Sequence, residues 1–542
     1  MSLFRTLGRA TPPSNQARTF SRKTAPRRIA SMVAGTVVLV LAAAGCAAGG
    51  GSGQSSAGYD GDTLTFATGT VPPSLNPAVG DPAYGLLYQW AYDPLVIMNG
   101  DGTYSPGLAE EFGYIGEGNQ TYEITLRDGV EFSDGATLDA EALKTYLDYV
   151  RSQTIGSPTT LLASVDTVAV TGPLTVTLTL NRPDPGLTFY FAQAFGVGFV
   201  ISPDAIEDPS SLDATTAGAG PYMLDPDETV AGDHYTFVQN PNYWNPERQH
   251  WEKVTVRVIA NASSTIQALQ AGQVQAALGD ATTIPAAEKA GIDVIAPPQA
   301  LSGINLADRG GELSEPIGDV RVRQALNMAV DRKTIAKALY GSEDLALSQY
   351  ALEGQAGFTQ ELAETYPYDP EAAKALLADA GYPDGFTLPV LTTSVSGLDK
   401  LTEAVAGQLS EVGVTLDITT QASAPDYFTA MVSKEYPAAV IGYGLANMNT
   451  LWAGFINPVG PFNMFGTADP ELDSLYQQYW TADEEAGVGL QQDINARLVD
   501  QAWTIPVVGA PLSYYLASGL TGIEATPANS GVPLITDLQP AK

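Results

Sequence analysis

Apolar and polar residues alternate at several places along the chain, and each alternation predicts a β-strand with one buried face. The clearest case is residues 174–180, where leucine and valine alternate with threonine. The same period of two recurs at residues 122–126 and 254–258. These segments predict sheets that bury one face against a core.

Other segments carry the start and stop signals of helices. Asp369 followed by Pro370 is typical of an N-cap and a first helical position, and Gly381 is a typical stop. The apolar residues of this helix are expected along one face, at Ala372, Leu376 and Ala380. Residues 319–341 predict two further helices, which begin after the caps Asp319 and Asp331.

One stretch of the chain combines the helical period and the strand period. An apolar stripe at helical spacing covers residues 398–412 and ends before Gly413. Strand-like residues 388–391 precede this stripe, and strand-like residues 414–418 follow it. A strand, a helix and a strand within about 30 residues predict a parallel βαβ unit, so the expected fold class is α/β.

The N-terminus has the pattern of an export signal. Residues 1–28 are basic, residues 29–44 are apolar, and small residues lead to Cys46, the only cysteine. This box resembles that of bacterial lipoproteins, which implies a signal peptide over residues 1–45 and a lipid on Cys46. The Gly/Ser-rich residues 46–59 predict a flexible tether. A plain secreted or membrane-anchored protein is the alternative, and we expect the general secretory route rather than the twin-arginine route.

The charge of the chain excludes one class of partner. The 542 residues contain 26 basic and 60 acidic side chains, a net charge of −34, and seven of the basic residues lie in the leader. A protein with this excess of negative charge is repelled by the phosphate backbones of DNA and RNA. We therefore expect no nucleic-acid partner.

The sequence offers no familiar catalytic or metal motif. A single cysteine excludes an intramolecular disulfide, and the two histidines, His234 and His250, are expected at the surface. No P-loop, His-Glu-x-x-His or Gly-x-Ser-x-Gly signature is present. We therefore expect no enzyme, cofactor or metal. A secreted hydrolase with a carboxylate pair stays open as an alternative, because sixty acids allow many pairings, and so does an adhesin or chaperone without a small ligand.

Several phrases, in order along the chain, resemble the family 5 extracytoplasmic solute-binding proteins of ABC importers, the dipeptide and oligopeptide-binding group. They lie at residues 64–67, 74–77, 101–110, 126–135, 218–222, 240–244, 319–327, 331–332 and 369–385. The most recognisable one is residues 126–135, Leu-Arg-Asp-Gly-Val-Glu-Phe-Ser-Asp-Gly. The resemblance covers roughly residues 62–530.

The resemblance implies a two-lobed periplasmic-binding-protein-like fold of type II, cluster C, with an extra small inserted domain. Lobe I is expected to combine residues 60–85, 196–299 and 504–542, the inserted domain residues 86–195, and lobe II residues 300–503. Ligand binding between the lobes is expected to close them by hinge motion. The implied role is a monomeric receptor, anchored by lipid on the outer face of a bacterial cell membrane, that delivers a small molecule or peptide to an ABC permease and its ATPase.

The resemblance also implies where the ligand binds. The pocket segments of the family correspond by position to residues 80–84, 301–305, 442–449 and 505–509 of this chain. The candidate ligand contacts in and beside them are Asp81, Tyr84, Ser302, Tyr443, Asn447 and Trp452.

The ligand itself stays open. Peptide binders of the group carry an Asp that pairs with the ligand's ammonium, and Ala446 stands at that position here. A peptide is the first expectation, held by backbone pairing or by another anchor such as Asp81. The alternative is an oligosaccharide whose rings stack on Tyr84, Tyr443 and Trp452. The pocket segments contain no histidine, which argues against a nickel–histidine chelate.

Overall fold

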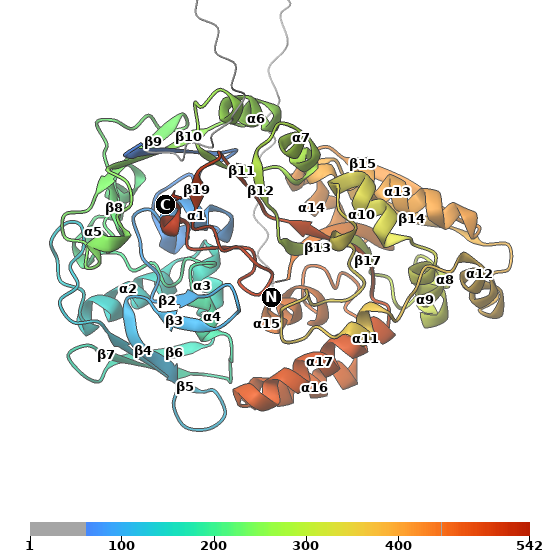
Figure 1. Ribbon diagram of the computed structural model, residues 1–542. Coiled ribbons are helices and arrows are strands. Elements are labelled where there is room, and N and C mark those ends of the chain that lie inside the picture. Colours follow the sequence, from blue (N-terminus) through green and yellow to red (C-terminus); the bar gives the residue numbers. More distant parts are fainter. Residues whose placement is uncertain (1–60, 446, 542) are drawn as a thin grey trace, which may run out of the picture. The chain divides into compact units, whose positions relative to one another are not determined.

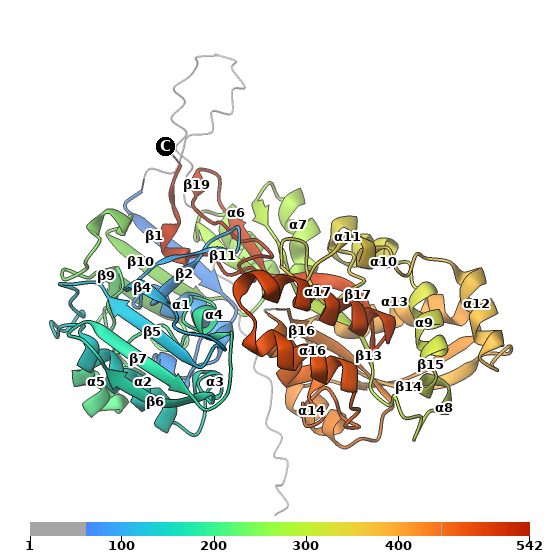
Figure 2. The same ribbon diagram turned by 90° about the horizontal axis from the view of Figure 1, so that it is seen from below.

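The computed structural model describes residues 61–445 and 447–541 (Figures 1 and 2). The predicted signal peptide, the tether and Cys46 lie outside these residues, and so does Ala446. Strands and helices are both abundant, which confirms the predicted α/β class. Within the described residues, no helix has the length and apolarity needed to cross a bilayer.

A seven-stranded sheet contains the first strand of the chain. Its strands, in spatial order, are β12 (Asp293–Ile295), β18 (Ser513–Leu516), β11 (Ala276–Gly279), β1 (Thr63–Thr68), β10 (Lys253–Val258), β9 (His234–Gln239) and β8 (Tyr222–Leu224). Strand β1 runs parallel to β10 and β11. Trp90 packs edge-on against Phe66 of β1 and Tyr222 of β8, so aromatic rings fill the core beneath this sheet. Helices α6 (Ala262–Gln270) and α7 (Ile284–Lys289) also belong to this part.

A four-stranded antiparallel sheet confirms the predicted alternation. Its strands are β4 (Ala109–Tyr114), β5 (Thr121–Leu126), β7 (Thr175–Leu180) and β6 (Val165–Val170). Strand β7 buries Val176, Leu178 and Leu180 and leaves its threonines more exposed. Helix α2 (Ala140–Ser152), capped by the Asp139 side chain, packs on β6 and β7. The short hairpin of β2 (Val96–Met98) and β3 (Tyr104–Pro106) and helix α4 (Leu187–Tyr190) lie in the same stretch of sequence.

A five-stranded sheet contains the predicted βαβ unit. Its strands are β15 (Val414–Gln421), β14 (Phe386–Thr393), β16 (Ala438–Gly444), β13 (Pro298–Leu306) and β17 (Thr504–Pro511). Strands β14 and β15 are parallel, and α13 (Leu398–Glu411) joins them, as predicted. Gly413 has a φ of +87°, which only glycine adopts readily, so the helix stops there.

The predicted helix caps are present. Asp319 caps α9 (Val320–Met328), Asp331 caps α10 (Arg332–Tyr340) and Asp369 caps α12 (Pro370–Asp379). In α12 the fully buried residues are Ala373 and Leu377, and the predicted face of Ala372, Leu376 and Ala380 is half-buried beside them. Helix α12 packs against α9, and the line of contact lies one residue further along than the pattern indicates.

Two neighbouring strands connect the seven-stranded and five-stranded sheets. Strand β13 follows β12 after two residues, and β17 is followed by β18 after one residue. Because β13 and β17 pair with each other, the chain passes between the two sheets along one paired ribbon. We call β13 and β17 the crossing strands.

Both histidines are half-buried rather than fully solvated. His234 begins β9, and its Nδ1 lies 2.7 Å from Asp233 Oδ2. His250 precedes β10, and partial burial lowers its pKa. Among the described residues, no group of three or more His, Cys, Asp or Glu side chains is arranged to hold a metal ion.

Candidate functional site

A cavity of about 900 Å³ lies where three parts of the chain meet. One wall comes from residues around the four-stranded sheet, between 98 and 119 and between 185 and 189. A second wall comes from residues 350–351, 354–357 and the segment that follows β16. The third comes from α16 (Pro470–Thr481) and α17 (Glu484–Asp500). This volume is within the range of small-molecule sites, and we call the cavity the main cleft.

The N-terminal end of helix α17 faces the main cleft. Asp483 caps this end, because its Oδ1 accepts a hydrogen bond from Ala486 N at 2.9 Å. Gly487, Val488 and Gln491 follow on the cleft side of the first two turns. Helices α16 and α17 lie side by side, so Tyr479 of α16 joins the same wall (Figure 2).

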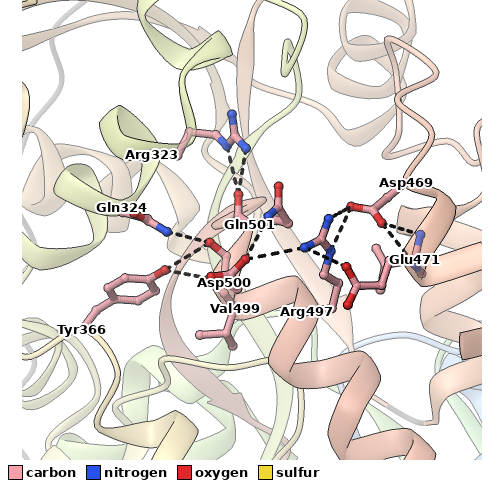
Figure 3. A network of polar contacts seen from close by, with 10 residues as sticks. Arg323, Gln324, Tyr366, Asp469, Glu471, Arg497, Val499, Asp500 and Gln501 are labelled. Atoms are coloured by element: carbon pink, nitrogen blue, oxygen red, sulfur yellow. Dashed lines mark hydrogen bonds and ion pairs between the residues drawn. The ribbon is translucent and has the colours of Figure 1, made fainter. Parts of the chain in front are cut away.

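The other end of α17 is fixed by a network of polar contacts (Figure 3). Arg497 pairs with Asp469 Oδ2 at 2.9 Å and with Glu471 Oε2 at 3.0 Å, both at the start of α16. At the last turn, backbone carbonyls accept hydrogen bonds from Arg323, Gln324 and Tyr366 side chains. Arg323 and Gln324 satisfy the carbonyls of Gln501 and Asp500 at the helix end. Tyr366 adds a bond to Val499 O, which also accepts from backbone N–H groups. The network therefore holds α17 in the direction that points its first turn at the cleft.

Among the described residues, eight aromatic and thioether side chains line the main cleft. They are Met98, Tyr104, Phe112, Tyr114, Phe189, Tyr350, Met448 and Tyr479. Burial raises the pKa of Tyr350 to about 12, and burial together with the Glu484 carboxylate raises the pKa of Tyr104. These phenols are therefore neutral at physiological pH, and they can offer ring faces and hydroxyl groups to a ligand.

All charged side chains that line the main cleft are acidic. They are Asp101, Asp483 and Glu484, and no Lys or Arg of the described residues is among the lining side chains. Hydrogen bonds from Thr103 lower the pKa of Asp101 and keep this carboxylate ionised. Four amides, Asn119, Gln355, Asn447 and Gln491, supply neutral donors and acceptors. The cleft is thus suited to neutral or positively charged groups.

Hydrogen bonds join the part around the four-stranded sheet to the helices on the other side of the cleft. Asn119 Nδ2 donates to Trp480 O at 3.0 Å and to Ala482 O at 2.8 Å. Asn449 Nδ2 donates to Asp184 Oδ1 at 3.2 Å, and Trp480 Nε1 donates to Asn449 Oδ1 at 3.1 Å. Asp184 is only 5% exposed, and burial raises its pKa. The main cleft is therefore bridged by polar contacts between its walls.

Of the six predicted ligand contacts, Asn447 lines the main cleft. Asn447 also caps α15 (Met448–Leu451), because its Oδ1 accepts from Thr450 N at 2.9 Å. Ser302 lies on β13 and lines a second cavity on the opposite face of that strand. The other four line neither of these two cavities.

Those four residues have local roles. Asp81 is exposed, and its Oδ1 accepts from Ala83 N at 2.9 Å. Tyr84 is partly buried against the core under the seven-stranded sheet. Tyr443 packs edge-on against Phe455 and Phe462, and Trp452 packs between Tyr476 and Trp480. Ligand contact by any of the six residues stays a prediction.

Several cleft residues are not among the predicted contacts. Tyr104 lies in the phrase of residues 101–110, which as a family motif indicates a scaffold role. Asp483 followed by two glutamates is a readable helix start. The sequence does not indicate that this helix start faces a cavity, because that depends on how α17 packs on α16.

Comparison with known proteins identifies the family. The family described as "Bacterial extracellular solute-binding proteins, family 5 Middle" matches this chain over residues 103–460. Heme-binding protein A of Haemophilus influenzae is 27% identical over 529 residues, which cover 89% of this chain and 94% of that protein. The glutathione-binding protein GsiB of Salmonella paratyphi A is 29% identical over 327 residues, 58% of this chain and 60% of the relative.

The fold is shared with solved structures. The ABC transporter substrate-binding protein CtaP of Listeria monocytogenes has a TM-score of 0.76 at 23% identity, covering 89% of this chain and all of CtaP. This likeness confirms the two-lobed type II fold of periplasmic binding proteins. The relatives are binding proteins and not enzymes, which supports a binding role over the hydrolase alternative. The chain belongs to the bacterial extracellular solute-binding proteins of family 5, which bind small-molecule or peptide ligands and work with ABC permeases.

Proposed function

We propose that this protein captures a peptide in the main cleft and delivers it to an ABC permease and its ATPase. The observation that carries the proposal is the cleft of about 900 Å³ between segments that the crossing strands connect. Lobe I would comprise residues 60–85, 196–299 and 504–542, the inserted domain residues 86–195, and lobe II residues 300–503. The crossing strands would then act as the hinge, and ligand would favour the closed form by its higher affinity for that form.

The chemistry of the cleft wall supports a peptide that has a free ammonium group and no exposed excess of negative charge. Glu484 and Asp483 can pair with the ammonium, which would replace the Asp that peptide binders of the group carry at the position of Ala446. Among the lining amides, Gln491 makes no side-chain hydrogen bond to other described residues and can bond peptide N–H and C=O groups. Asn119 Oδ1 and Asn447 Nδ2 offer one further acceptor and one further donor, because the other atom of each amide is already bonded within the protein. Neutral tyrosines can pack against apolar side chains of the peptide.

The same wall disfavours anionic solutes. Two relatives are named for heme and glutathione, and both compounds carry carboxylates. The cleft of this chain offers no Lys or Arg among its described lining side chains, so a buried carboxylate of the ligand would lack a charged partner. Glutathione is itself a peptide but carries a net negative charge, so we propose a peptide that carries none.

An oligosaccharide is the second candidate. The observation that favours it is the combination of exposed ring faces with amide and carboxylate groups, such as Tyr104 beside Glu484. Such groups can stack on sugar rings and accept hydrogen bonds from hydroxyls. Unlike a peptide, a sugar does not need the ammonium pairing.

We also propose that the receptor is a monomer tethered by a lipid on Cys46 to the outer face of the cell membrane. The leader pattern and the Gly/Ser tether support this placement. Metabolic labelling with a radioactive fatty acid tests it. The full chain should be labelled, and Cys46→Ala should abolish the label. A labelled Cys46→Ala protein would contradict the lipid attachment.

Thermal unfolding with a library of dipeptides to pentapeptides and oligosaccharides tests the ligand class. A true ligand at one hundred times its Kd should stabilise the protein by about 2.7 kcal/mol. We expect stabilisation by free-amine peptides, less by their N-acetylated forms, and recovery of the ligand unchanged. Stabilisation by sugars alone would favour the second candidate. Stabilisation by neither class would overturn both.

A further inference from the structure

We propose that the protein has a second ligand site, behind the crossing strands, that takes a small arylalkylamine. The site is a cavity of about 430 Å³, which we call the rear cavity. Its volume is within the range of small-molecule sites. The inference does not depend on the identity of the solute in the main cleft.

The rear cavity and the main cleft lie on opposite faces of the same sheet. Successive side chains of a strand point to opposite faces. Leu301 of β13 belongs to the same hydrophobic cluster as Tyr350 and Leu445, which line the main cleft, whereas the next residue, Ser302, lines the rear cavity. Gly442 of β16 pairs with Ser302 and lines the rear cavity as well. The two sites are therefore separated by the sheet.

The walls of the rear cavity come from both sides of the crossing strands. Residues 279–282 follow β11 of the seven-stranded sheet. Residues 393–398 and 424–428 follow β14 and β15 of the five-stranded sheet. A molecule in this cavity would thus contact both sheets at once.

Aromatic and aliphatic side chains dominate these walls. The rings are those of Tyr340, Tyr427, Phe428 and Phe462, and Val395 and Leu398 add aliphatic surface. Phe428 is 49% exposed, and Val395 is 39% exposed, which is high for apolar side chains of this size. The Tyr427 hydroxyl is already used, because it donates to Val440 O. These walls suit one aromatic ring.

Two hydroxyl groups on largely buried residues add polar atoms to the wall of the rear cavity. Ser302 is 2% exposed and Tyr340 is 3% exposed. Neither hydroxyl makes a hydrogen bond within the part of the chain that the structure describes, and neither oxygen is among the fully buried unpaired atoms of that part, so both are accessible from the cavity. A ligand in the rear cavity can therefore form hydrogen bonds with these groups.

The charges around the rear cavity select the head group of the ligand. Asp280 lines the cavity, and its Oδ1 accepts from Thr282 N at 2.9 Å. The carboxylate lies near enough to Tyr340 to act on it electrostatically. The described lining residues include no Lys, Arg or His. An ammonium group in the cavity is attracted by Asp280 and can donate to a hydroxyl of the wall, whereas a carboxylate would be repelled.

Gly442 allows a direct test of the cavity. A Cβ at this position would have Leu398 Cδ1 at 3.7 Å and Ser302 Oγ at 3.8 Å as its nearest neighbours, which are ordinary contact distances. The Cβ of a leucine at position 442 would therefore cause no clash, and the rest of its side chain can extend into the cavity. Gly407 offers a matched control, because a Cβ at that exposed position of α13 meets nothing within 4 Å.

Titration calorimetry with 2-phenylethylamine tests the proposal on the full mature protein. We expect saturable binding, and binding weaker by about tenfold or more in Gly442→Leu and by about threefold in Ser302→Ala, as expected for loss of volume and of one hydrogen bond. Gly407→Leu and Ser433→Ala should bind as the unmodified protein does. Melting temperatures of all four variants verify that they are folded.

Two further arms test the charge preference of the rear cavity and its independence from the main cleft. The anionic analogue 3-phenylpropionate should bind about tenfold more weakly than the amine or not at all, because Asp280 repels it. Glu484→Gln, in the main cleft, should leave amine binding unchanged. The proposal is overturned if the amine does not bind, if the carboxylate binds equally well, if Gly442→Leu has no effect, or if Glu484→Gln abolishes binding.

Discussion

At the scale of single residues, the described part of the chain uses its few positive charges for structure. Arg309 is buried, and its guanidinium lies 3.9 Å from the ring centre of Trp503. Arg332 is also buried and donates to Pro506 O at 2.8 Å. Burial lowers the pKa of both groups. Arg309 bonds the side chains of Asn305 and Asn463, and Arg332 bonds backbone, so both serve the core. The charged side chains that line the main cleft, among the described residues, are all acidic.

Glu484 provides a test of the proposed ammonium site. Glu484→Gln should weaken binding of a free-amine peptide by about threefold to tenfold, because a partly exposed ion pair contributes about 1 kcal/mol. Glu485→Gln is the matched control, since this neighbour does not line the main cleft. Calorimetry with the peptide and with its N-acetylated form provides the measurement. Equal losses for the two forms would show that Glu484 does not contact the ammonium.

Asp93 should make stability depend on pH. It is 3% exposed, its Oδ2 accepts from Tyr243 Oη and Trp244 Nε1, both at 2.9 Å, and its Oδ1 has no partner among the described residues. Burial raises its pKa above the ordinary value of 3.8. The folded state therefore binds a proton more readily than the unfolded state, and this group favours folding increasingly as the pH falls from the raised value toward 3.8.

Urea unfolding at several pH values checks this dependence against Asp93→Asn, which cannot ionise. The free energy of unfolding of the unmodified protein, relative to that of the variant, should rise as the pH is lowered. A difference that is constant or falls with decreasing pH would contradict the protonation of Asp93 in the folded state.

At the scale of elements, local signals in the sequence predict helices and strands well. Asp331 and Asp369 cap helices as predicted, because capping depends on neighbours within three residues. The alternation in residues 174–180 predicts β7 for the same local reason. Packing between elements is less predictable. Tyr443 and Trp452 are aromatic residues near a loop, and the structure places both in ring clusters.

A substitution in helix α17 tests how one element positions the site. Arg497→Met should lower the free energy of unfolding by about 1–2 kcal/mol, because Asp469, only 9% exposed, loses its cationic partner. Lys374→Met is the control, since its pair with Glu371 is exposed and contributes little. Urea unfolding gives both values. An equal effect of the two substitutions would contradict a special role for the network in Figure 3.

At the scale of the whole molecule, the family resemblance was needed to predict the two-lobed fold. The crossing strands are far apart in sequence, at Pro298–Leu306 and Thr504–Pro511, and no local pattern indicates that they pair. Likewise, the main cleft unites residues from 98 to 528. Sequence reasoning found Asn447 through its place in a family loop, but it could not find Tyr104, whose position in the cleft depends on the packing of distant segments.

The bridging hydrogen bonds indicate which contacts distinguish the closed form of the main cleft from an open form. Asn119 and Asn449 join the walls of the main cleft by three hydrogen bonds, which must break when the cleft opens. In the proposed cycle, the ligand adds contacts to both walls and raises the population of the bridged form.

The most direct test of ligand-driven closure is the distance between spin labels on the two walls. Labels at Glu117→Cys and Gln478→Cys, both exposed positions, in a Cys46→Ser protein can be measured by double electron–electron resonance. A saturating peptide should replace a broad, long distance distribution by a narrower and shorter one. An unchanged distribution with the peptide bound, verified by calorimetry on the same sample, would contradict the account.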